Sequence, residues 1–340
     1  MKIAYVRPYE GEIDIVSESM PEIEFVAVQD VTELDESTRI EIEVLSVFVD
    51  YQVTAQILDL LPNLKMITTR SAGYDHIDTA ATKDRNITVC RVPHYGTRTV
   101  AEYAIALMFA LSRNAFRSYT DMQRDVGITN FEAYEGFDLY GKTLGIVGTG
   151  AIGRSVCTIA RGIGMNVVAY DVSPDESFAT ENDVIYATLD EVLAQADIVS
   201  LHVPSIPTTQ HLINEEKLRI MKPGSYLINT ARGEVVDTKA LVQCLNDGHL
   251  AGAGLDVLEG EHALREEAEL LTKGTVDTKL WETLVADHAL IDMPNVIVTP
   301  HIAFNTVEAK REITDITLTN IESFIAGESQ NIVLQHEPNN

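Results

Sequence analysis

Short apolar runs separated by helical patterns organise most of the chain after residue 142. Apolar runs without polar alternation are typical of strands buried on both faces, as in a parallel sheet covered by helices. Their alternation with helical patterns therefore predicts an α/β fold. The expected strands are 144–147, 167–170, 198–201, 225–229, 251–255 and 296–298, with helices from 151 and over 188–195 among the segments between them.

The segment before residue 97 predicts a second, smaller α/β unit. Short apolar runs and helical patterns recur here, but no glycine fingerprint accompanies them. The expected strands are 2–9, 44–49, 66–69 and 87–92, with a helix over 54–61. At the other end of the chain, a last helix is expected over 306–326.

A long apolar helix is predicted from Thr97 to about Arg117. One apolar side consists of residues at helical spacing, namely Val100, Ala104, Leu107, Met108, Leu111 and Ala115. Tyr103, Ala106 and Ala110 add a second apolar side. A helix with two apolar sides must be buried on both of them. The second side can pack against the protein's own core or against another subunit.

A glycine turn between two strands predicts a dinucleotide site. Gly148 permits a tight turn after the first strand, Gly150 lets the backbone approach a pyrophosphate, and Gly153 lets the helix pack closely. Asp171, after the second strand, can accept hydrogen bonds from a ribose hydroxyl and would repel a 2'-phosphate, which favours NAD over NADP. A purely structural turn is the alternative, but strand, turn, helix and acid follow in the order that a dinucleotide requires.

The composition limits the classes of partner. With 340 residues and 45% hydrophobic content, the chain is long enough for two globular domains. Its 25 basic and 52 acidic residues give a net charge of −27, which argues against nucleic acid and anionic membranes as partners. A solvated acidic surface is the simplest explanation of this charge. Adaptation to high salt is a sharper hypothesis, motivated by the acid excess and by lysine being scarcer than arginine.

The cysteines and the hydrophobic stretches indicate a soluble, cytoplasmic protein. Cys90, Cys157 and Cys244 lie far apart without ligand spacing, so neither a disulfide framework nor a metal site is expected. The amino terminus lacks the apolar segment of a signal peptide. The longest apolar stretch, 100–111, is too short to span a membrane and contains Glu102.

Three residues that follow predicted strands suit hydride transfer to a carbonyl beside a carboxylate. Ligands of a doubly wound sheet lie beyond the carboxyl ends of its strands. Arg232 can bind a carboxylate with two parallel hydrogen bonds, His301 can exchange a proton near neutral pH, and a carboxylate such as Glu261 can orient the imidazole. Plainer roles are a surface ion pair for Arg232, solvation for Glu261 and, for the nearby His202, a strand cap.

Seven motifs in order resemble those of the D-isomer-specific 2-hydroxyacid dehydrogenases, and the resemblance is closest to the branch of D-lactate dehydrogenases and their vancomycin-resistance relatives. The motifs are RSAGYDHID (70–78), VPHYGTRTVAE (92–102), GIVGTGAIG (145–153), SLHVP (200–204), INTARGEVVD (228–237), GLDVLEGE (254–261) and TPHIAFNT (299–306). The match covers nearly the whole chain. Seven motifs in order are far more specific than any one of them.

The resemblance implies two Rossmann-like domains with the active site in a cleft between them. Residues 1–98 and 301–340 would form a flavodoxin-like, substrate-binding domain, and residues 99–300 a doubly wound, NAD-binding Rossmann domain. The cleft would close by hinge motion near 98–101 and 299–302. A homodimer is also implied, with the helix from Thr97 as its contact.

The resemblance also implies roles for single residues. Arg232 would bind the substrate carboxylate and carbonyl, His301 would be the acid/base, and Glu261 its partner. Ala72, Gly73 and Tyr95 would bind the substrate together with Arg232. The implied cofactor-binding residues are Gly148, Gly150, Ala151, Ile152, Gly153, Asp171, His202, Val203, Pro204, Thr209, Thr230, Ala231 and Asp256. Among these, Asp171 would bind the adenosine ribose and Asp256 would lie near the nicotinamide amide.

The implied activity is NAD-dependent, reversible reduction of a 2-keto acid of the pyruvate class to the D-2-hydroxy acid. Glu261 is followed by His262 rather than the proline of many relatives, and a long stretch separates it from the MPNVIVTPH run, as in the lactate branch. Asn305, where lactate-type members often have an aromatic residue, could make the pocket more polar.

Two other activities on the same fold are compatible with these residues, and two more are disfavoured by them. A hydroxypyruvate or glyoxylate reductase of the same family is one alternative, and a non-catalytic, corepressor-like NAD-binding scaffold is another. A formate dehydrogenase would have glutamine in place of Glu261, and many phosphoglycerate dehydrogenases carry an added regulatory domain for which this chain is expected to be too short.

Overall fold

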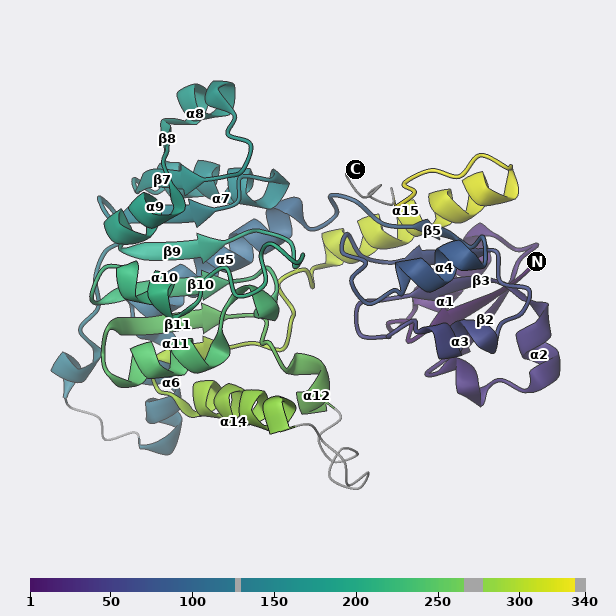
Figure 1. Ribbon diagram of the computed structural model, residues 1–340, viewed down its shortest axis with the longest axis horizontal. Coiled ribbons are helices and arrows are strands. Elements are labelled where there is room, and N and C mark those ends of the chain that lie inside the picture. Colours follow the sequence, from purple (N-terminus) through teal and green to yellow (C-terminus); the bar gives the residue numbers. More distant parts are fainter. Residues whose placement is uncertain (126–129, 266–277, 334–340) are drawn as a thin grey trace. The chain divides into compact units, whose positions relative to one another are not determined.

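Two compact α/β units make up the protein. The computed structural model describes residues 1–125, 130–265 and 278–333 (Figure 1). Unit 1 comprises Met1–Tyr95 with Thr306–Asn340, and unit 2 comprises Gly96–Asn305. Each unit contains a parallel sheet covered by helices, which confirms the predicted fold class. The predicted domain boundaries, 98/99 and 300/301, lie a few residues from the boundaries of these units.

Unit 1 contains a five-stranded parallel sheet in the order β2-β1-β3-β4-β5. The strands are β1 (Lys2–Val6), β2 (Glu24–Val28), β3 (Ile42–Val47), β4 (Met66–Thr69) and β5 (Thr88–Cys90). This is the strand order of flavodoxin-like folds, in which ligands bind beyond the carboxyl ends of the strands.

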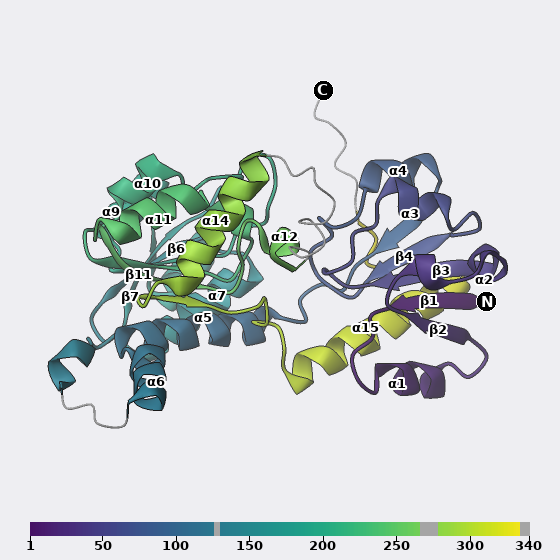
Figure 2. The same cartoon turned by 90° about the horizontal axis from the view of Figure 1, so that it is seen from below.

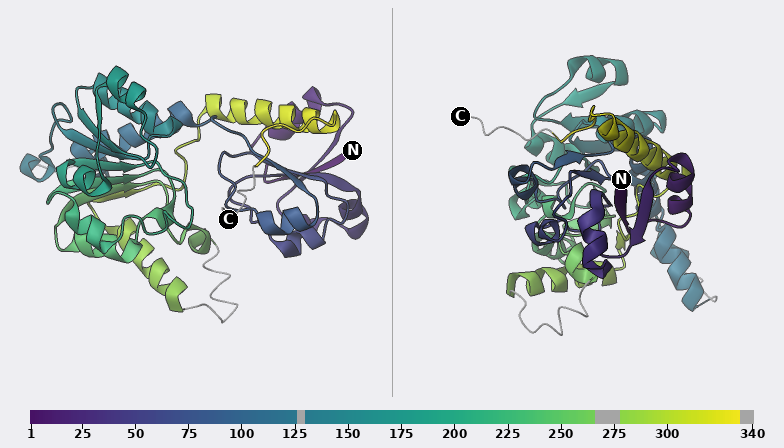
Figure 3. Two further views of the ribbon diagram at one scale, coloured as in Figure 1. Left: turned by 45° about the horizontal axis from the view of Figure 1, so that its top comes forward. Right: turned by 90° about the vertical axis from the view of Figure 1, so that its right-hand side faces the viewer.

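Helices cover both faces of the unit 1 sheet (Figure 2). They are α1 (Glu12–Ser19) and α15 (Val307–Ile325) on one face, and α3 (Ala55–Asp59) and α4 (Thr79–Asp84) on the other, with α2 (Glu36–Glu41) and the 3₁₀ turn η1 (Val31–Glu33) in the connection to β3. Successive residues of β1 point to opposite faces, so Tyr5 packs with Leu318 of α15 and Val6 packs with Leu58 of α3. A second orientation shows α15 along this unit (Figure 3).

Two predictions for unit 1 were wrong. The first strand ends at Val6 rather than at residue 9, because Arg7 has a left-handed backbone (φ 50°) and Pro8 has no amide hydrogen to donate. The sequence pattern did not predict β2, whose residues are mostly exposed or half-buried at the edge of the sheet. Residues 25–28 of this strand form a short apolar run, FVAV, so β2 was missed although its sequence is mostly apolar.

Unit 2 contains a seven-stranded parallel sheet in the order β12-β11-β10-β9-β6-β7-β8 (Figure 1). The strands are β6 (Thr143–Val147), β7 (Asn166–Tyr170), β8 (Val184–Tyr186), β9 (Ile198–Leu201), β10 (Ser225–Asn229), β11 (Leu250–Leu255) and β12 (Val296–Val298). The chain runs outward from β6 in one direction and from β9 in the other. A doubly wound sheet binds its ligand beyond the carboxyl ends of strands at this point of reversal.

Two apolar cores flank the unit 2 sheet. One contains residues of α5 (Thr97–Ser112) and α7 (Ala151–Gly162), and the other contains residues of α9 (Leu189–Gln195), α10 (Glu215–Ile220), α11 (Thr238–Asn246) and α14 (Thr278–Asp292). The other helices in the described part of unit 2 are α6 (Ala115–Arg124), α8 (Glu176–Asn182), α12 (Glu261–Arg265) and the 3₁₀ turns η2 (Phe131–Tyr134) and η3 (Gly233–Val235). A Cβ at Gly145 of β6 would lie 2.8 Å from the Ala196 side chain, so α9 and the loop after it pack directly on this strand.

The predicted helix from Thr97 to Arg117 was wrong at its end. Helix α5 stops at Ser112, and Asn114 has a left-handed backbone (φ 50°) before α6 begins. Half of α5 is buried, whereas no residue of α6 is buried within unit 2. The pattern also missed β8, a three-residue strand at the edge of the sheet.

The three cysteines are buried and free. Burial raises the pKa of the Cys90 thiol to about 11 and that of Cys157 to about 12, so both are protonated and unreactive at neutral pH. Within the described parts of the chain, no helix is long and apolar enough to cross a membrane. The same parts contain no cluster of three or more His, Cys, Asp or Glu side chains placed to hold a metal ion.

Candidate functional site

The glycine turn lies at the carboxyl end of β6, at the point where the strand order reverses. Gly148 has φ 96°, and a Cβ there would lie 2.7 Å from the carbonyl oxygen of His202. A Cβ at Gly153 would lie 2.0 Å from the carbonyl oxygen of Gly148, so the first turn of α7 packs against the loop itself. The space beside Gly150 is open, and among the described residues no side chain caps the helix that begins after it. The turn therefore leaves room and free amides for an anion.

Asp171 follows β7 and faces this turn. Its Oδ2 accepts hydrogen bonds from the amide (2.6 Å) and the hydroxyl (3.0 Å) of Thr149, and its Oδ1 accepts one from the amide of Ser173 (2.9 Å). Partial burial opposes ionisation, but these hydrogen bonds prevail and lower the pKa of Asp171. The carboxylate is charged at neutral pH, as a partner for ribose hydroxyls requires.

His202, Val203 and Pro204 follow β9 and lie beside the glycine turn. The His202 amide donates to the carbonyl of Val147 (2.8 Å), and its Nε2 lies 2.9 Å from the hydroxyl of Ser200. Burial lowers the pKa of His202 to about 3, so this imidazole is neutral. Thr209 donates its hydroxyl to the carbonyl of Pro204 (2.5 Å) and holds this loop in place.

The loop after β10 carries Thr230, Ala231 and Arg232. Asn229 fixes it from both sides, since its Oδ1 accepts from the Ala231 amide (3.0 Å) and its Nδ2 donates to the Arg232 carbonyl (2.9 Å). Arg232 is half-buried and donates from Nη1 to the Ala231 carbonyl (2.8 Å). The buried hydroxyl of Thr230 has no hydrogen-bond partner in the described part of the chain. An unpaired buried hydroxyl at this edge fits a site completed by a bound molecule.

The loops after β10 and β11 touch each other through their backbones. A Cβ at Gly233 would lie 2.1 Å from the carbonyl carbon of Leu258 and 2.4 Å from the amide nitrogen of Glu259. Only glycine allows this approach. The residue after Arg232 is therefore in contact with the turn that leads to Glu261.

His301 lies just beyond β12 in a strained backbone conformation. Its φ is 56°, in the left-handed region that residues with a side chain rarely adopt. Asp256, at the end of β11, holds this bend with its carboxylate, which accepts from the Thr299 hydroxyl (2.5 Å) and the amides of Ile302 (3.0 Å) and Ala303 (2.8 Å). Burial raises the pKa of Asp256, although these hydrogen bonds oppose the rise.

Glu261 and His301 form a hydrogen-bonded pair. Glu261 Oε1 lies 2.9 Å from His301 Nδ1, and the two side chains are 20% and 16% exposed. An ionised carboxylate only accepts hydrogen bonds, so the proton between them belongs to Nδ1. The other ring nitrogen, Nε2, is then the atom that can exchange a proton with a substrate.

Ala72, Gly73 and Tyr95 belong to unit 1. Ala72 and Gly73 follow β4 in a loop where the Ser71 hydroxyl donates to the Gly73 carbonyl (2.6 Å). The loop begins at Arg70, whose buried guanidinium forms an ion pair with buried Glu12 (2.6 Å). Tyr95 is half-buried at the last position before the boundary of the unit.

The structure also adds residues that the sequence did not suggest. His211 Nε2 lies 2.8 Å from Glu259 Oε1, a second histidine–carboxylate pair next to the turn of Glu261. Asp287 of α14 accepts a hydrogen bond from the Gly260 amide in the same turn (3.0 Å). Glu259 lies within the GLDVLEGE motif and could have drawn attention, but no local pattern marks His211 or Asp287.

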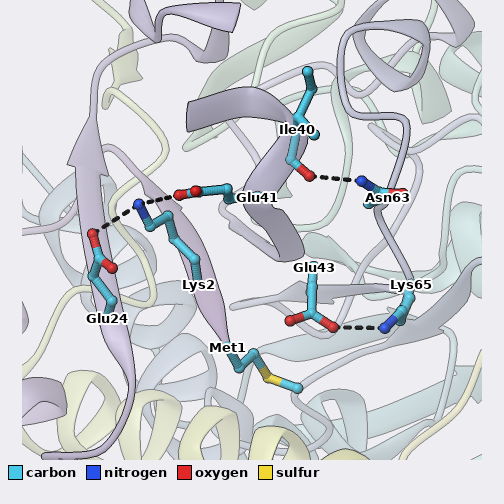
Figure 4. A pocket seen from close by; sticks show the side chains of 8 residues that line it. All are labelled: Met1, Lys2, Glu24, Ile40, Glu41, Glu43, Asn63 and Lys65. Atoms are coloured by element: carbon cyan, nitrogen blue, oxygen red, sulfur yellow. Dashed lines mark hydrogen bonds and ion pairs between the residues drawn. The ribbon is translucent and has the colours of Figure 1, made fainter. Parts of the chain in front are cut away.

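A pocket of about 460 Å³ opens elsewhere, among the amino ends of the unit 1 strands (Figure 4). Its lining residues are Met1, Lys2, Glu24, Ile40, Glu41, Glu43, Asn63 and Lys65. Lys2 pairs with Glu24 and Glu41, and Lys65 pairs with Glu43. Ligands of parallel α/β sheets bind at the opposite, carboxyl edge, and the charges of this pocket already satisfy one another. We therefore do not assign it to the reaction.

Comparison with known proteins places this chain among dehydrogenases and reductases of small hydroxy acids and keto acids. Residues 105–303 match the family described as D-isomer specific 2-hydroxyacid dehydrogenase, NAD binding domain. The chain is 38% identical to a glycerate dehydrogenase of Methylorubrum extorquens, over 82% of each chain. It is 33% identical to a glyoxylate reductase of Korarchaeum cryptofilum, over 93% of this chain and 87% of the relative. Among solved structures, D-lactate dehydrogenase from Aquifex aeolicus, complexed with NAD and lactic acid, is 34% identical, with a TM-score of 0.85 over 96% of each chain.

Proposed function

Because the chain belongs to the family of D-isomer-specific 2-hydroxyacid dehydrogenases, we propose that it reversibly reduces a 2-keto acid of the pyruvate class to the D-2-hydroxy acid. The predicted family and NAD as its cofactor are confirmed by the same comparisons. The observation that carries the proposed chemistry is the Glu261–His301 pair, at 2.9 Å, in the unit that also holds the glycine turn and Arg232.

Arg232 is the proposed anchor of the substrate. Its guanidinium can donate two parallel hydrogen bonds to the carboxylate of a 2-keto acid and can also polarise the neighbouring carbonyl. Asn229 on the strand side and Gly233 on the loop side restrict the backbone at this position. In the proposal, Ala72, Gly73 and Tyr95 add contacts to the substrate from unit 1.

His301 is the proposed acid/base. Its Nε2 donates a proton to the carbonyl oxygen during reduction and accepts it during oxidation. Glu261 holds the proton on Nδ1 and thereby orients the imidazole. Asp256 keeps the bend at His301 in place through three hydrogen bonds to the segment around it.

The residues around the glycine turn fit the cofactor. NADH, when bound, supplies the hydride. Gly148, Gly150 and Gly153 leave the space for a pyrophosphate, and the ionised Asp171 suits the ribose hydroxyls. The unpaired hydroxyl of Thr230 can donate to or accept from a bound group at the same edge of the sheet. We propose the same role for the other predicted cofactor-binding residues.

The similar structures and the sequence relatives support different substrates. The solved structures similar to this chain include several D-lactate dehydrogenases. The sequence relatives instead include a glycerate dehydrogenase and a glyoxylate reductase. Asn305, close after His301, would favour a more polar substrate. A hydroxypyruvate or glyoxylate reductase is therefore the second candidate.

One assay separates these candidates. We would follow NADH consumption with pyruvate, 2-ketobutyrate, phenylpyruvate, hydroxypyruvate, glyoxylate and oxaloacetate, and determine the chirality of each product that has a stereocentre. Fastest turnover of pyruvate to D-lactate supports the proposal, whereas a preference for hydroxypyruvate or glyoxylate supports the second candidate. Binding of NADH without turnover of any keto acid would contradict both and favour a scaffold.

We also propose that the protein is a homodimer in the cytoplasm. The apolar residues exposed on and near α5 and α6 are Phe109, Phe116, Tyr119, Met122 and Phe131. Figure 2 shows α6 standing away from the body of unit 2. A patch of this kind on one unit is typical of a subunit contact. The free cysteines agree with a reducing compartment.

A further inference from the structure

The turn Leu258–Glu261 is held from three sides within unit 2. On one side the backbone of Gly233 presses against Leu258 and Glu259. On a second side His211 pairs with the Glu259 carboxylate. On the third side Asp287 of α14 accepts from the Gly260 amide. The last residue of this turn is Glu261, which is hydrogen-bonded to His301.

Asp287 is unusual because it is fully buried, at 0% exposure. Its Oδ2 lies 3.0 Å from the Gly260 nitrogen, and a Cβ at Gly260 would lie 2.5 Å from the same oxygen and 3.3 Å from Cγ2 of Thr283. Residues 283 and 287 are one helical turn apart, so one face of α14 lies directly on the backbone of the turn. The other oxygen, Oδ1, has no hydrogen-bond partner in the described part of the chain.

A buried carboxylate with a single hydrogen bond is costly for stability. An apolar residue of similar size would fill the same space without the loss of hydration. Within the described residues, the Gly260 amide is the one hydrogen-bond donor to Asp287, so this hydrogen bond can offset part of the cost of burying the carboxylate.

The charges around Asp287 come from the turn and from α14. Glu259 and Glu261 on the turn repel its negative charge, whereas His288 on α14 attracts it. Burial is the largest effect and, with the two glutamates, raises the pKa of Asp287 to about 7. A carboxyl group accepts a hydrogen bond from an amide in its neutral and in its ionised form. The contact with Gly260 therefore persists on both sides of neutral pH.

We propose that Asp287 is a positioning residue whose hydrogen bond to the Gly260 amide fixes the turn that carries Glu261 and thereby holds the Glu261 carboxylate against His301 Nδ1. Asp287 acts through Glu261 and does not itself touch the substrate. The inference rests on the proposed function, because the Glu261–His301 pair matters for turnover only if the chain reduces a keto acid.

The first test compares two substitutions of Asp287 with a matched control. Asp287→Leu removes the acceptor and should lower kcat by about 10- to 100-fold with an unchanged KM for NADH. Asp287→Asn keeps an oxygen that accepts from Gly260 and should retain kcat within about threefold. The control is Asp197→Leu, which removes a carboxylate that accepts from the Thr143 amide (2.9 Å) at the amino edge of the same sheet, and should leave kcat unchanged.

A second readout does not depend on turnover. The Nδ1 proton of His301, held by Glu261, should give a protected low-field signal in proton NMR, identified by its loss in His301→Gln. Asp287→Leu should lose this signal, as Glu261→Gln should, whereas Asp287→Asn should keep it. If Asp287→Leu does not fold, Asp287→Ser replaces it, since serine is too short to reach the Gly260 amide.

The outcomes separate the two proposals. Wild-type kcat and a retained Nδ1 signal in a folded Asp287→Leu or Asp287→Ser variant would overturn the positioning role. An equal loss in Asp287→Asn would also overturn it, because the acceptor is then not what matters. If the wild-type protein turns over none of the keto acids, the proposed function fails, and the NMR signal still decides whether Asp287 positions Glu261.

Discussion

Arg232 offers a direct test at the scale of one residue. Replacement by alanine should raise KM for the keto acid and lower kcat together, reducing kcat/KM by about 100-fold or more, because two charge-assisted hydrogen bonds are lost. Arg232→Lys keeps the charge but not the planar fork, and should recover only part of the loss. Steady-state kinetics with the preferred keto acid measure both. Unchanged kinetics in Arg232→Ala would remove this residue from the mechanism.

Glu261 is expected to matter for turnover because it orients His301. Glu261→Gln keeps the shape of the side chain but removes the carboxylate that holds the proton on Nδ1, so kcat for keto acid reduction should fall by about 10- to 100-fold. Steady-state kinetics measure the change, with Asp197→Asn as a control. An unchanged kcat in Glu261→Gln would contradict the role of Glu261.

Because Asp287 is buried, we expect the free energy of unfolding to depend on pH. The pKa of Asp287 is about 7 in the folded protein and near the ordinary value of 3.8 in the unfolded chain. Between these values the folded state holds a proton that the unfolded state has released, so this group makes the free energy of unfolding fall as pH rises. Asp287→Asn should lose this slope and gain up to a few kcal/mol over the wild type at pH 7 and above. Urea denaturation across this pH range measures the difference, and parallel curves for the two proteins would contradict it.

The sequence suggested the proposed reactive pair but not the residue that supports it. Motif positions after strands brought out Glu261 and His301, because the carboxyl ends of parallel strands meet at one edge. The contact between Asp287 and Gly260 joins residues 27 positions apart and follows from how α14 packs. No local spacing encodes such a contact, so sequence reasoning had no means to single out Asp287.

At the scale of elements, the exposed apolar residues on and near α5 and α6 lead us to expect the subunit contact there. Phe116 on α6 is 52% exposed, and placing a charge there should weaken a dimer by about 100-fold or more. Phe116→Glu should therefore sediment as a monomer in analytical ultracentrifugation. Ile185→Glu, at an exposed position of the edge strand β8, is the matched control and should remain a dimer. Dimers in both variants would place the contact elsewhere.

Elements buried on both faces were easier to predict than elements at the edges. The strands β9 and β10 in the middle of the sheet were both predicted at their observed residues. The edge strands β2 and β8 also contain short apolar runs, 25–28 and 184–186, but they pack on fewer neighbours and were both missed. The end of α5 depends on a left-handed residue, Asn114, at a point where the apolar spacing continues into α6. Apolar periodicity reports burial and does not report such a break.

At the scale of the whole molecule, the net charge of −27 predicts a response to salt. Like charges on the surface repel one another in the folded state, and salt screens this repulsion over about 10 Å at 0.1 M and about 3 Å at 1 M. We expect the free energy of unfolding to rise between about 0.1 M and about 1 M KCl, and turnover to be maintained. Chemical denaturation with urea and NADH-linked assays at each concentration measure both. A steady fall in activity with rising salt would contradict adaptation to salt.

The division of unit 1 between the two ends of the chain sets the order of events during synthesis. Leu318 and Ile321 of α15 pack in one core with Ile3 and Tyr5 of β1, and the Val333 amide donates to the carbonyl of Val89 in β5. The ribosome must therefore complete all of unit 2 before the last helix of unit 1 emerges, a delay of roughly 10 to 40 s at about 5–20 residues per second. Throughout this delay the first unit to leave the ribosome lacks part of its core, so the unit that emerges first is the last that can finish folding.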